Sequence, residues 1–169
     1  MKRLLQITLM TFVMTGLTTV ALAQSGNADI TASAEVISVV NVTPGNNLNF
    51  GTVTPGTPSS VAVTDGNAGT FDISGNGGNL QLEFTALPTD LTGPGGNLPI
   101  SFADGDASWS DNGTPSNPFN PNDSPGTSLD ISADSDGTIT VFIGGTVSPP
   151  LGLQAGTYNE TITLTATYN

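Results

Sequence analysis

Oxygen-bearing side chains are almost the only ones in this chain that could do chemistry. The 169 residues include 14 Asp and Glu but no His and no Cys, and the two basic residues, Lys2 and Arg3, stand at the start. Nucleophiles activated by His, lysine Schiff bases and Cys/His zinc sites are therefore excluded. Binding to nucleic acid or to an anionic membrane surface is excluded too, because the chain after Arg3 has no basic side chain to pair with phosphates.

Two groups of carboxylates carry the oxygen ligands that Ca²⁺ prefers. These weak metal candidates are Asp104, Asp106 and Asp111 in one group and Asp130, Asp134 and Asp136 in the other. The second group overlaps part of an EF-hand loop, but Ser132 stands where that pattern has an acid and Ile143 where it has Glu. We interpret both groups as loops and turns and expect neither a metal nor a cofactor.

The three glutamates do not form a catalytic pair. A glycosidase needs two carboxyl groups facing one cleft. Glu35, Glu83 and Glu160 instead fall in predicted strands, facing outward or at strand ends. We therefore expect a protein that is not an enzyme.

The first 23 residues have the pattern of a secretory signal peptide. Lys2-Arg3 precede an apolar stretch from Leu4 to Val20, and Ala21-Leu22-Ala23 is a cleavage motif of small residues. We expect cleavage before Gln24 and export through a periplasm to the cell surface or the medium. An uncleaved membrane anchor is the alternative.

Apolar residues alternate with polar ones through the remaining chain, which is typical of half-buried antiparallel strands. The pattern is clearest at residues 80–85, 138–143 and 161–168. It predicts an all-β protein, an antiparallel immunoglobulin-like β-sandwich of about eight to ten strands, with a closed barrel as the alternative. Asn76-Gly77 and Asp136-Gly137 each predict a hairpin between their flanking strands.

The strands that must position any site fall in one domain. We expect an N-terminal extended arm and first strand over residues 24–42 and a single β-sandwich over 43–169. The segment 104–125 has four Asp, four Pro and the single Trp109, and it predicts a long acidic surface loop.

Both ends of the exported chain could pair with another sheet edge. The arm has one apolar face, and the last strand alternates up to the penultimate Tyr168, with Gly156 preceding it. The candidate assembly residues are Ile30, Ala32, Ala34, Val36, Gly156, Ile162, Leu164, Ala166 and Tyr168.

This C-terminal arrangement resembles the strand that a periplasmic chaperone binds in chaperone–usher pilus subunits. Phe50-Gly51, Gly144-Gly145-Thr146, Gly156-Thr157-Tyr158 and the final Tyr168 also look like a bacterial secreted β-domain family of unknown function, related to pilin-like and spore-coat-U-like proteins. The resemblance spans most of residues 28–169. Many pilus subunits carry a disulfide, whereas this chain has no Cys.

The resemblance implies a fimbrial-type surface subunit that pairs strands with like subunits or with a periplasmic chaperone. The alternative is a monomeric secreted domain that binds carbohydrate or Ca²⁺ through the 104–125 segment and Trp109. The alternative for the last strand is that it only closes the core of a self-contained sandwich, which would be a stand-alone surface domain.

Overall fold

The computed structural model describes residues 26–131 and 137–169. The predicted signal peptide, Asp134 and Asp136 lie outside these residues. The chain divides into two units, Met1–Glu35 and Val36–Asn169. In the first unit, the described residues 26–35 form neither a helix nor a strand, and the Ile30 side chain is 95% exposed.

The second unit holds twelve strands within the described residues, and every paired neighbour is antiparallel. The strands are β1 Val40–Pro44, β2 Ser59–Val61, β3 Gly69–Gly75, β4 Asn79–Ala86, β5 Asp90–Gly93, β6 Gly96–Ser101, β7 Ala107–Ser110, β8 Asn117–Phe119, β9 Thr127–Asp130, β10 Thr138–Ile143, β11 Gly145–Val147 and β12 Thr163–Tyr168. The predicted all-β antiparallel sandwich is confirmed, with more strands than the eight to ten expected. Among the described residues, no helix is long and apolar enough to cross a membrane.

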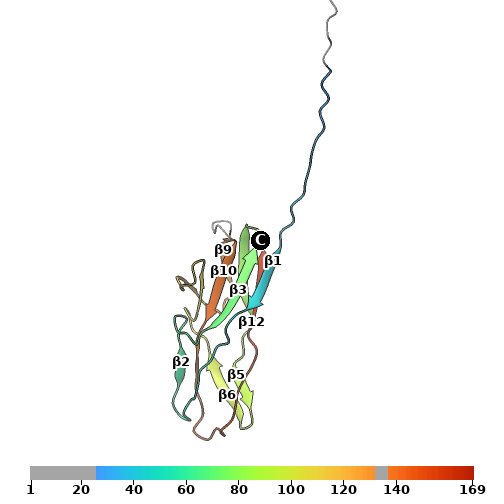
Figure 1. Cartoon of the computed structure of the whole chain (residues 1–169). Helices are drawn as coiled ribbons and strands as arrows, with labels where there is room; N and C mark the ends of the chain where they lie inside the picture. Colours follow the sequence, from blue (N-terminus) through green and yellow to red (C-terminus); the bar gives the residue numbers. More distant parts are fainter. Residues whose placement is uncertain (1–25, 132–136) are drawn as a thin grey trace, which may run out of the picture. The chain divides into compact units, whose positions relative to one another are not determined.

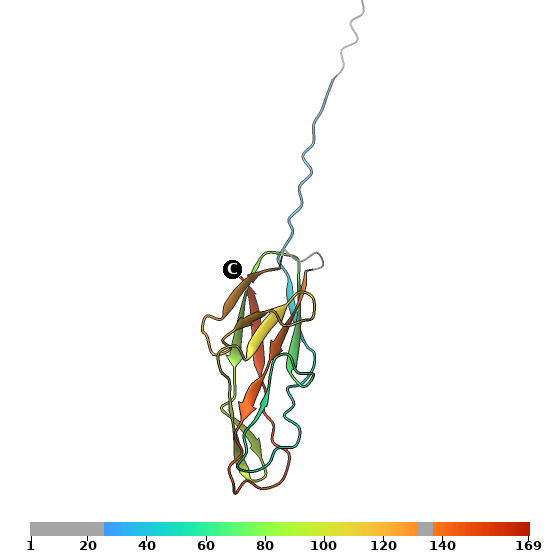
Figure 2. The ribbon, with the colours of Figure 1, turned by 90° about the vertical axis from the view of Figure 1, so that its left-hand side faces the viewer.

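The strands form three sheets (Figures 1 and 2). A five-stranded sheet with the order β1-β3-β10-β7-β8 stacks on a three-stranded sheet with the order β12-β4-β9. The four-stranded sheet, β2-β11-β6-β5, lies at the lower end of the unit in Figure 1. β1 and β12 are the edge strands on one side of the stacked pair and lie next to each other.

Alternation along the strands builds the main core. Leu80, Leu82 and Phe84 of β4 are buried, while the residues between them face outward. The main core buries further apolar side chains from β3, β7, β9, β10 and β12. A smaller core at the other end gathers Leu98, Ile100 and Val147 under loop side chains. The period-two prediction for residues 80–85, 138–143 and 161–168 is therefore confirmed.

Both predicted hairpins are wrong, because each turn joins strands of different sheets. β3 pairs with β1 and β10, whereas β4 pairs with β12 and β9. Gly77 and Gly78 adopt φ of 90° and 109°, which lets the chain cross from one layer of the sandwich to the other. β9 and β10 also lie in different sheets, so the residues around Asp136-Gly137 do not join a hairpin.

The segment 104–125 is not one continuous loop. It contains β7 and β8, which pair with each other at one edge of the five-stranded sheet. Trp109 lies in β7, is half-buried and packs against the main core. β7 was not predicted from the sequence because its four residues, in which apolar and polar types alternate, lie within a segment of acidic composition.

Candidate functional site

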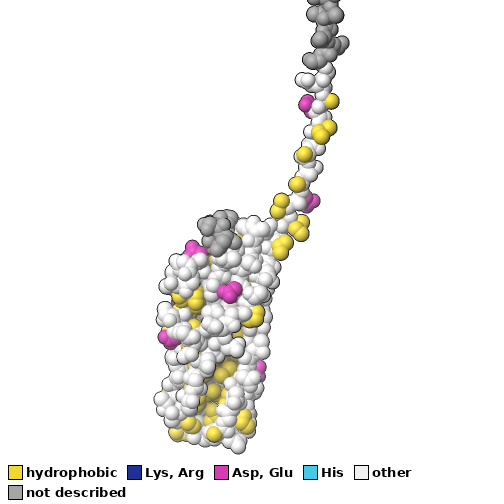
Figure 3. All heavy atoms as spheres, viewed as in Figure 1, with side chains coloured by type: hydrophobic (Ala, Val, Ile, Leu, Met, Phe, Trp, Pro, Cys, Tyr) yellow, Lys and Arg dark blue, Asp and Glu magenta, His cyan; other side chains and the backbone are white. Residues whose placement is uncertain are grey.

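A groove opens beside the edge strands β1 and β12, where the chain is not in a strand. One wall is the segment 45–53, which follows β1, and the other is the segment 156–162, which precedes β12. The groove has a volume of about 660 Å³. Figure 3 shows its floor as a yellow band of apolar side chains in a hollow in the lower half of the unit.

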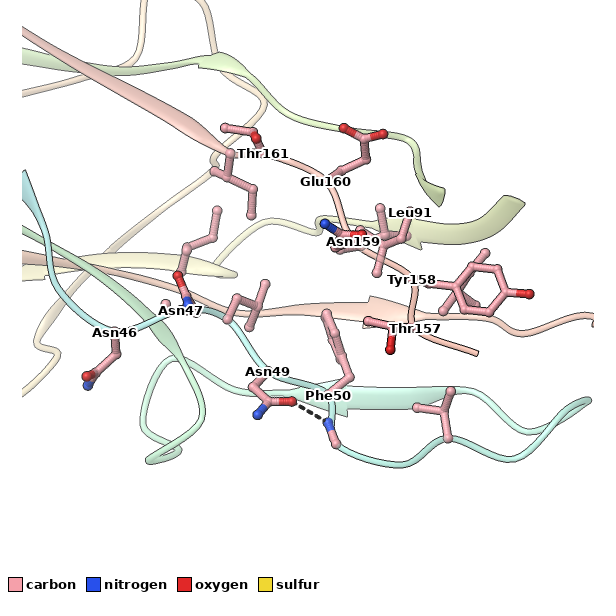
Figure 4. A pocket seen from close by; sticks show the side chains of 18 of the residues that line it. Asn46, Asn47, Asn49, Phe50, Leu91, Thr157, Tyr158, Asn159, Glu160 and Thr161 are labelled. Carbon is pink, nitrogen blue, oxygen red and sulfur yellow. Dashed lines mark hydrogen bonds between the residues drawn. The ribbon is translucent and has the colours of Figure 1, made fainter. Parts of the chain in front are cut away.

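The groove floor is apolar because it exposes part of the smaller core. Its apolar lining includes Leu48, Phe50, Leu91, Leu98, Ile100 and Ile162. In Figure 4 the Phe50 ring points across the gap toward the facing wall, whereas Asn46 lies on the outer side. These side chains are thus open to contact from the groove, between rims of polar residues.

Both walls leave some of their backbone groups unpaired, although Gly45 and Asn46 bond to Thr70 and the Asn49 N–H bonds to the Asn67 carbonyl. Leu48 and Phe50 make no backbone hydrogen bond with any described residue, and neither do Thr157, Glu160 and Ile162. The facing wall has one pair of backbone bonds to the sheet, where Asn159 and Thr92 exchange hydrogen bonds of 3.1 and 3.3 Å. Two extended segments with free N–H and C=O groups over an apolar floor have the requirements for accepting one more strand.

The polar rim of the groove carries amides and hydroxyls and a single carboxylate. Asn46, Asn47, Asn49, Thr157, Asn159 and Glu160 line it. The Asn49 side chain is already engaged, because its Oδ1 accepts a 2.8 Å hydrogen bond from the Gly51 N–H. The Glu160 carboxylate likewise accepts a 2.8 Å hydrogen bond from the Thr92 hydroxyl. None of these groups faces a basic side chain, since the described residues contain no Lys, Arg or His.

The structure brings only part of the predicted assembly set to the groove. Gly156 stands at its mouth, and Ile162 is half-buried in its lining. Leu164 and Ala166 are buried in the main core, so their side chains close the sandwich within the subunit. Ile30, Ala32 and Ala34 fall in the first unit, and Val36 is 84% exposed at the start of the second.

Gly156 has a local packing role. A side-chain carbon at this position would collide with the ring of Pro94, which lies in the turn between β5 and β6. The neighbouring Tyr158 hydroxyl accepts a hydrogen bond from the Gly95 N–H (3.1 Å) and donates one to the Gln154 carbonyl (2.8 Å). Together these contacts hold the wall 156–162 against the β5–β6 hairpin.

The other wall, 45–53, was not among the predicted site residues. Leu48 and Phe50 do alternate with Asn47 and Asn49, which is a strand-like pattern. The break at Pro44-Gly45 separates this run from β1, and no sequence signal shows that Leu48 and Phe50 lack backbone partners.

The metal candidates that the structure describes do not come together. Within the described residues, no three His, Cys, Asp or Glu side chains are grouped closely enough to hold a metal ion. Asp106 serves a turn instead, since its carboxylate accepts a 2.7 Å hydrogen bond from the Ala103 N–H.

Comparison with known proteins places the sandwich in a family. No curated protein and no solved structure matches the chain. The family described as "Domain of unknown function (DUF4402)" matches residues 40–168, from the first residue of β1 to the last residue of β12. Since this match covers the whole sandwich and most of the sequence, the chain belongs to the DUF4402 family of domains of unknown function.

Proposed function

We propose that this protein is an exported, non-enzymatic structural subunit that assembles with like subunits through β-strand pairing. The N-terminal arm of one copy would lie in the groove of another and pair with its walls. The observation that carries the proposal is the groove itself, an apolar floor of core residues between two walls in which Leu48, Phe50, Thr157, Glu160 and Ile162 make no backbone hydrogen bond with the described residues. Its chemistry suits an extended peptide with apolar side chains on one face.

The arm has the pattern and the length that this groove requires. Its apolar residues Ile30, Ala32, Ala34 and Val36 alternate with polar ones. An extended chain rises about 3.3 Å per residue, so Ile30–Val36 spans about 20 Å and the six residues from Thr157 to Ile162 span about 17 Å. One arm therefore matches one groove.

Proline distribution favours this side of the sandwich for pairing. The opposite side ends in β8, which has three residues and contains Pro118. Pro115, Pro121 and Pro125 flank it, and each proline removes a backbone donor. Neither groove wall contains a proline. The sandwich thus blocks strand addition at one side and permits it at the other.

The charge distribution indicates that a contact between like subunits would not use ion pairs. All 14 acidic residues follow residue 23, and no basic residue does. Two copies cannot attract each other through ion pairs, and Glu160 is the only charged residue that lines the groove. The pairing must therefore depend on apolar burial and backbone hydrogen bonds.

The test compares two double variants of the full chain by size-exclusion chromatography with light scattering. Ile30→Asp/Val36→Asp places charges on the apolar face of the arm, and Thr31→Asp/Ser33→Asp adds the same charge to its polar face. Burying an Ile or Val side chain contributes about 1.5–3 kcal/mol, so the first variant should stay monomeric while the second assembles like wild type.

Both variants should keep the wild-type melting temperature, because residues 26–36 form no strand and Ile30 and Val36 are exposed. A wild-type chain that stays monomeric at all concentrations would contradict the proposal, as would equal assembly by both variants.

A further inference from the structure

Asn76 and Tyr168 hold the residues that join the arm to the sandwich. The Val39 N–H donates to Asn76 Oδ1 (2.9 Å), and Asn76 Nδ2 donates to the Ile37 carbonyl (2.7 Å). The Tyr168 hydroxyl lies 3.1 Å from the Val39 carbonyl and can donate to it. The Asn76 amide thereby acts as a peptide group, and it extends the β1–β3 ladder beyond its last pair, Val40 with Gly75.

The two side chains are themselves tied together. The Asn76 N–H donates to the Tyr168 hydroxyl (3.1 Å). A side-chain carbon at Gly75 would meet this hydroxyl at 2.5 Å, so glycine is needed for the close approach. Residues 37–39 are therefore fixed in the extended direction of β1 by a cluster from two sheets, which we name the latch: Asn76 and Tyr168.

The arm would otherwise be able to reach the groove of its own chain. A hairpin reversal centred on Val39 would place Ile30 opposite Leu48 in antiparallel register, because each lies nine residues from the centre. Such a reversal would need Ile37 and Val39 to leave the extended conformation and lose their bonds to the latch. A subunit that filled its own groove could not join a neighbour.

We infer that the latch selects the partner: it keeps the arm out of its own groove and directs it to a second copy of this chain. This inference rests on the proposed function, because it presupposes that the groove accepts the arm. Asn76 and Tyr168 are positioning residues that need not touch the incoming arm.

The experiment uses the natural absence of cysteine. The full chain receives Ser33→Cys in the arm and Asn47→Cys at the groove rim, and a short bis-maleimide joins the two thiols. Denaturing gels then separate internally linked monomers from linked dimers and longer products. With the latch intact, we expect intermolecular products to dominate.

Tyr168→Phe and Asn76→Ala should raise the ratio of internal to intermolecular links about tenfold, the effect of losing one or two hydrogen bonds. Ser60→Ala is the matched control, because it removes a hydroxyl that lies 2.8 Å from the Thr146 hydroxyl between β2 and β11 and does not line the groove, and it should leave the ratio unchanged. A ratio that is equal in latch variants and control overturns the inference but leaves the proposed function intact. The absence of links of either kind overturns both.

Discussion

At Gly156 the ring of Pro94 leaves no room for a methyl group. Gly156→Ala should force the wall 156–162 away from the β5–β6 turn and lower the free energy of unfolding by about 1–3 kcal/mol, the usual cost of overpacking. Gly152→Ala is the matched control, since nothing lies within 4 Å of its added carbon. Urea denaturation measures both variants, and equal stability would show that the loop absorbs the methyl group freely.

Two neighbouring residues of β12 should respond in opposite ways to truncation. Leu164 is 7% exposed and belongs to the main core, whereas Thr163 faces solvent. Leu164→Ala should cost about 2–5 kcal/mol in unfolding free energy. Thr163→Ala should cost under about 1 kcal/mol. Similar losses in chemical denaturation would mean that the strand does not bury one face.

Among the strands, the sequence predicted the regular parts well and their connections badly. The alternation in β4, β10 and β12 follows directly from burying one face of a sheet, and the structure confirms it. The turn residues around Asn76-Gly77 do not reveal whether the next strand joins the same sheet. Here it crosses to the other layer, because β4 finds its partners in β9 and β12.

The groove was only partly predictable for a related reason. Ile162 and Gly156 were predicted from the alternation and the glycine spacing near the C-terminus, and both lie at the groove. Leu48 and Phe50 became candidates only from the structure, because their own N–H and C=O groups make no backbone hydrogen bond with any described residue. Whether a backbone N–H or C=O group lacks a partner depends on how the distant strands are arranged, and a local sequence pattern does not contain that information.

The β5–β6 hairpin should depend on Tyr158 more than the stacked sheets do. Its ring packs on the smaller core and its hydroxyl bridges Gly95 and Gln154. Tyr158→Ala should lower hydrogen-exchange protection in β5 and β6 while β4 and β10 stay protected, because Tyr158 packs on the smaller core and β4 and β10 belong to the main core. Tyr158→Phe should affect mainly the Gly95 amide. Uniform loss of protection across all strands would mean that the two cores unfold together.

For the protein as a whole, unbalanced negative charge should make stability depend on salt. No basic residue follows Arg3, so the sandwich has no ion pairs to offset repulsion among its carboxylates. The Debye length falls from about 30 Å at 0.01 M to about 3 Å at 1 M salt, so the melting temperature should rise over this range. CaCl₂ at matched ionic strength should act no more strongly than NaCl. A flat response would show that the charges lie too far apart, and a specific Ca²⁺ effect would indicate a metal site.

The latch and β1 also determine how the subunit would carry mechanical force. If residue 36 is pulled while the groove is held, tension runs along β1, and the β1–β3 hydrogen bonds are loaded together in shear. Pulling instead between residues 36 and 74 would peel β1 away from β3 one bond at a time. Single-molecule force measurements should therefore give a higher rupture force for attachment at residues 36 and 160 than at 36 and 74. Equal forces would mean that β1 bears no load. The expected difference would mean that the β1–β3 hydrogen bonds, next to the latch, limit the tensile strength of the proposed assembly.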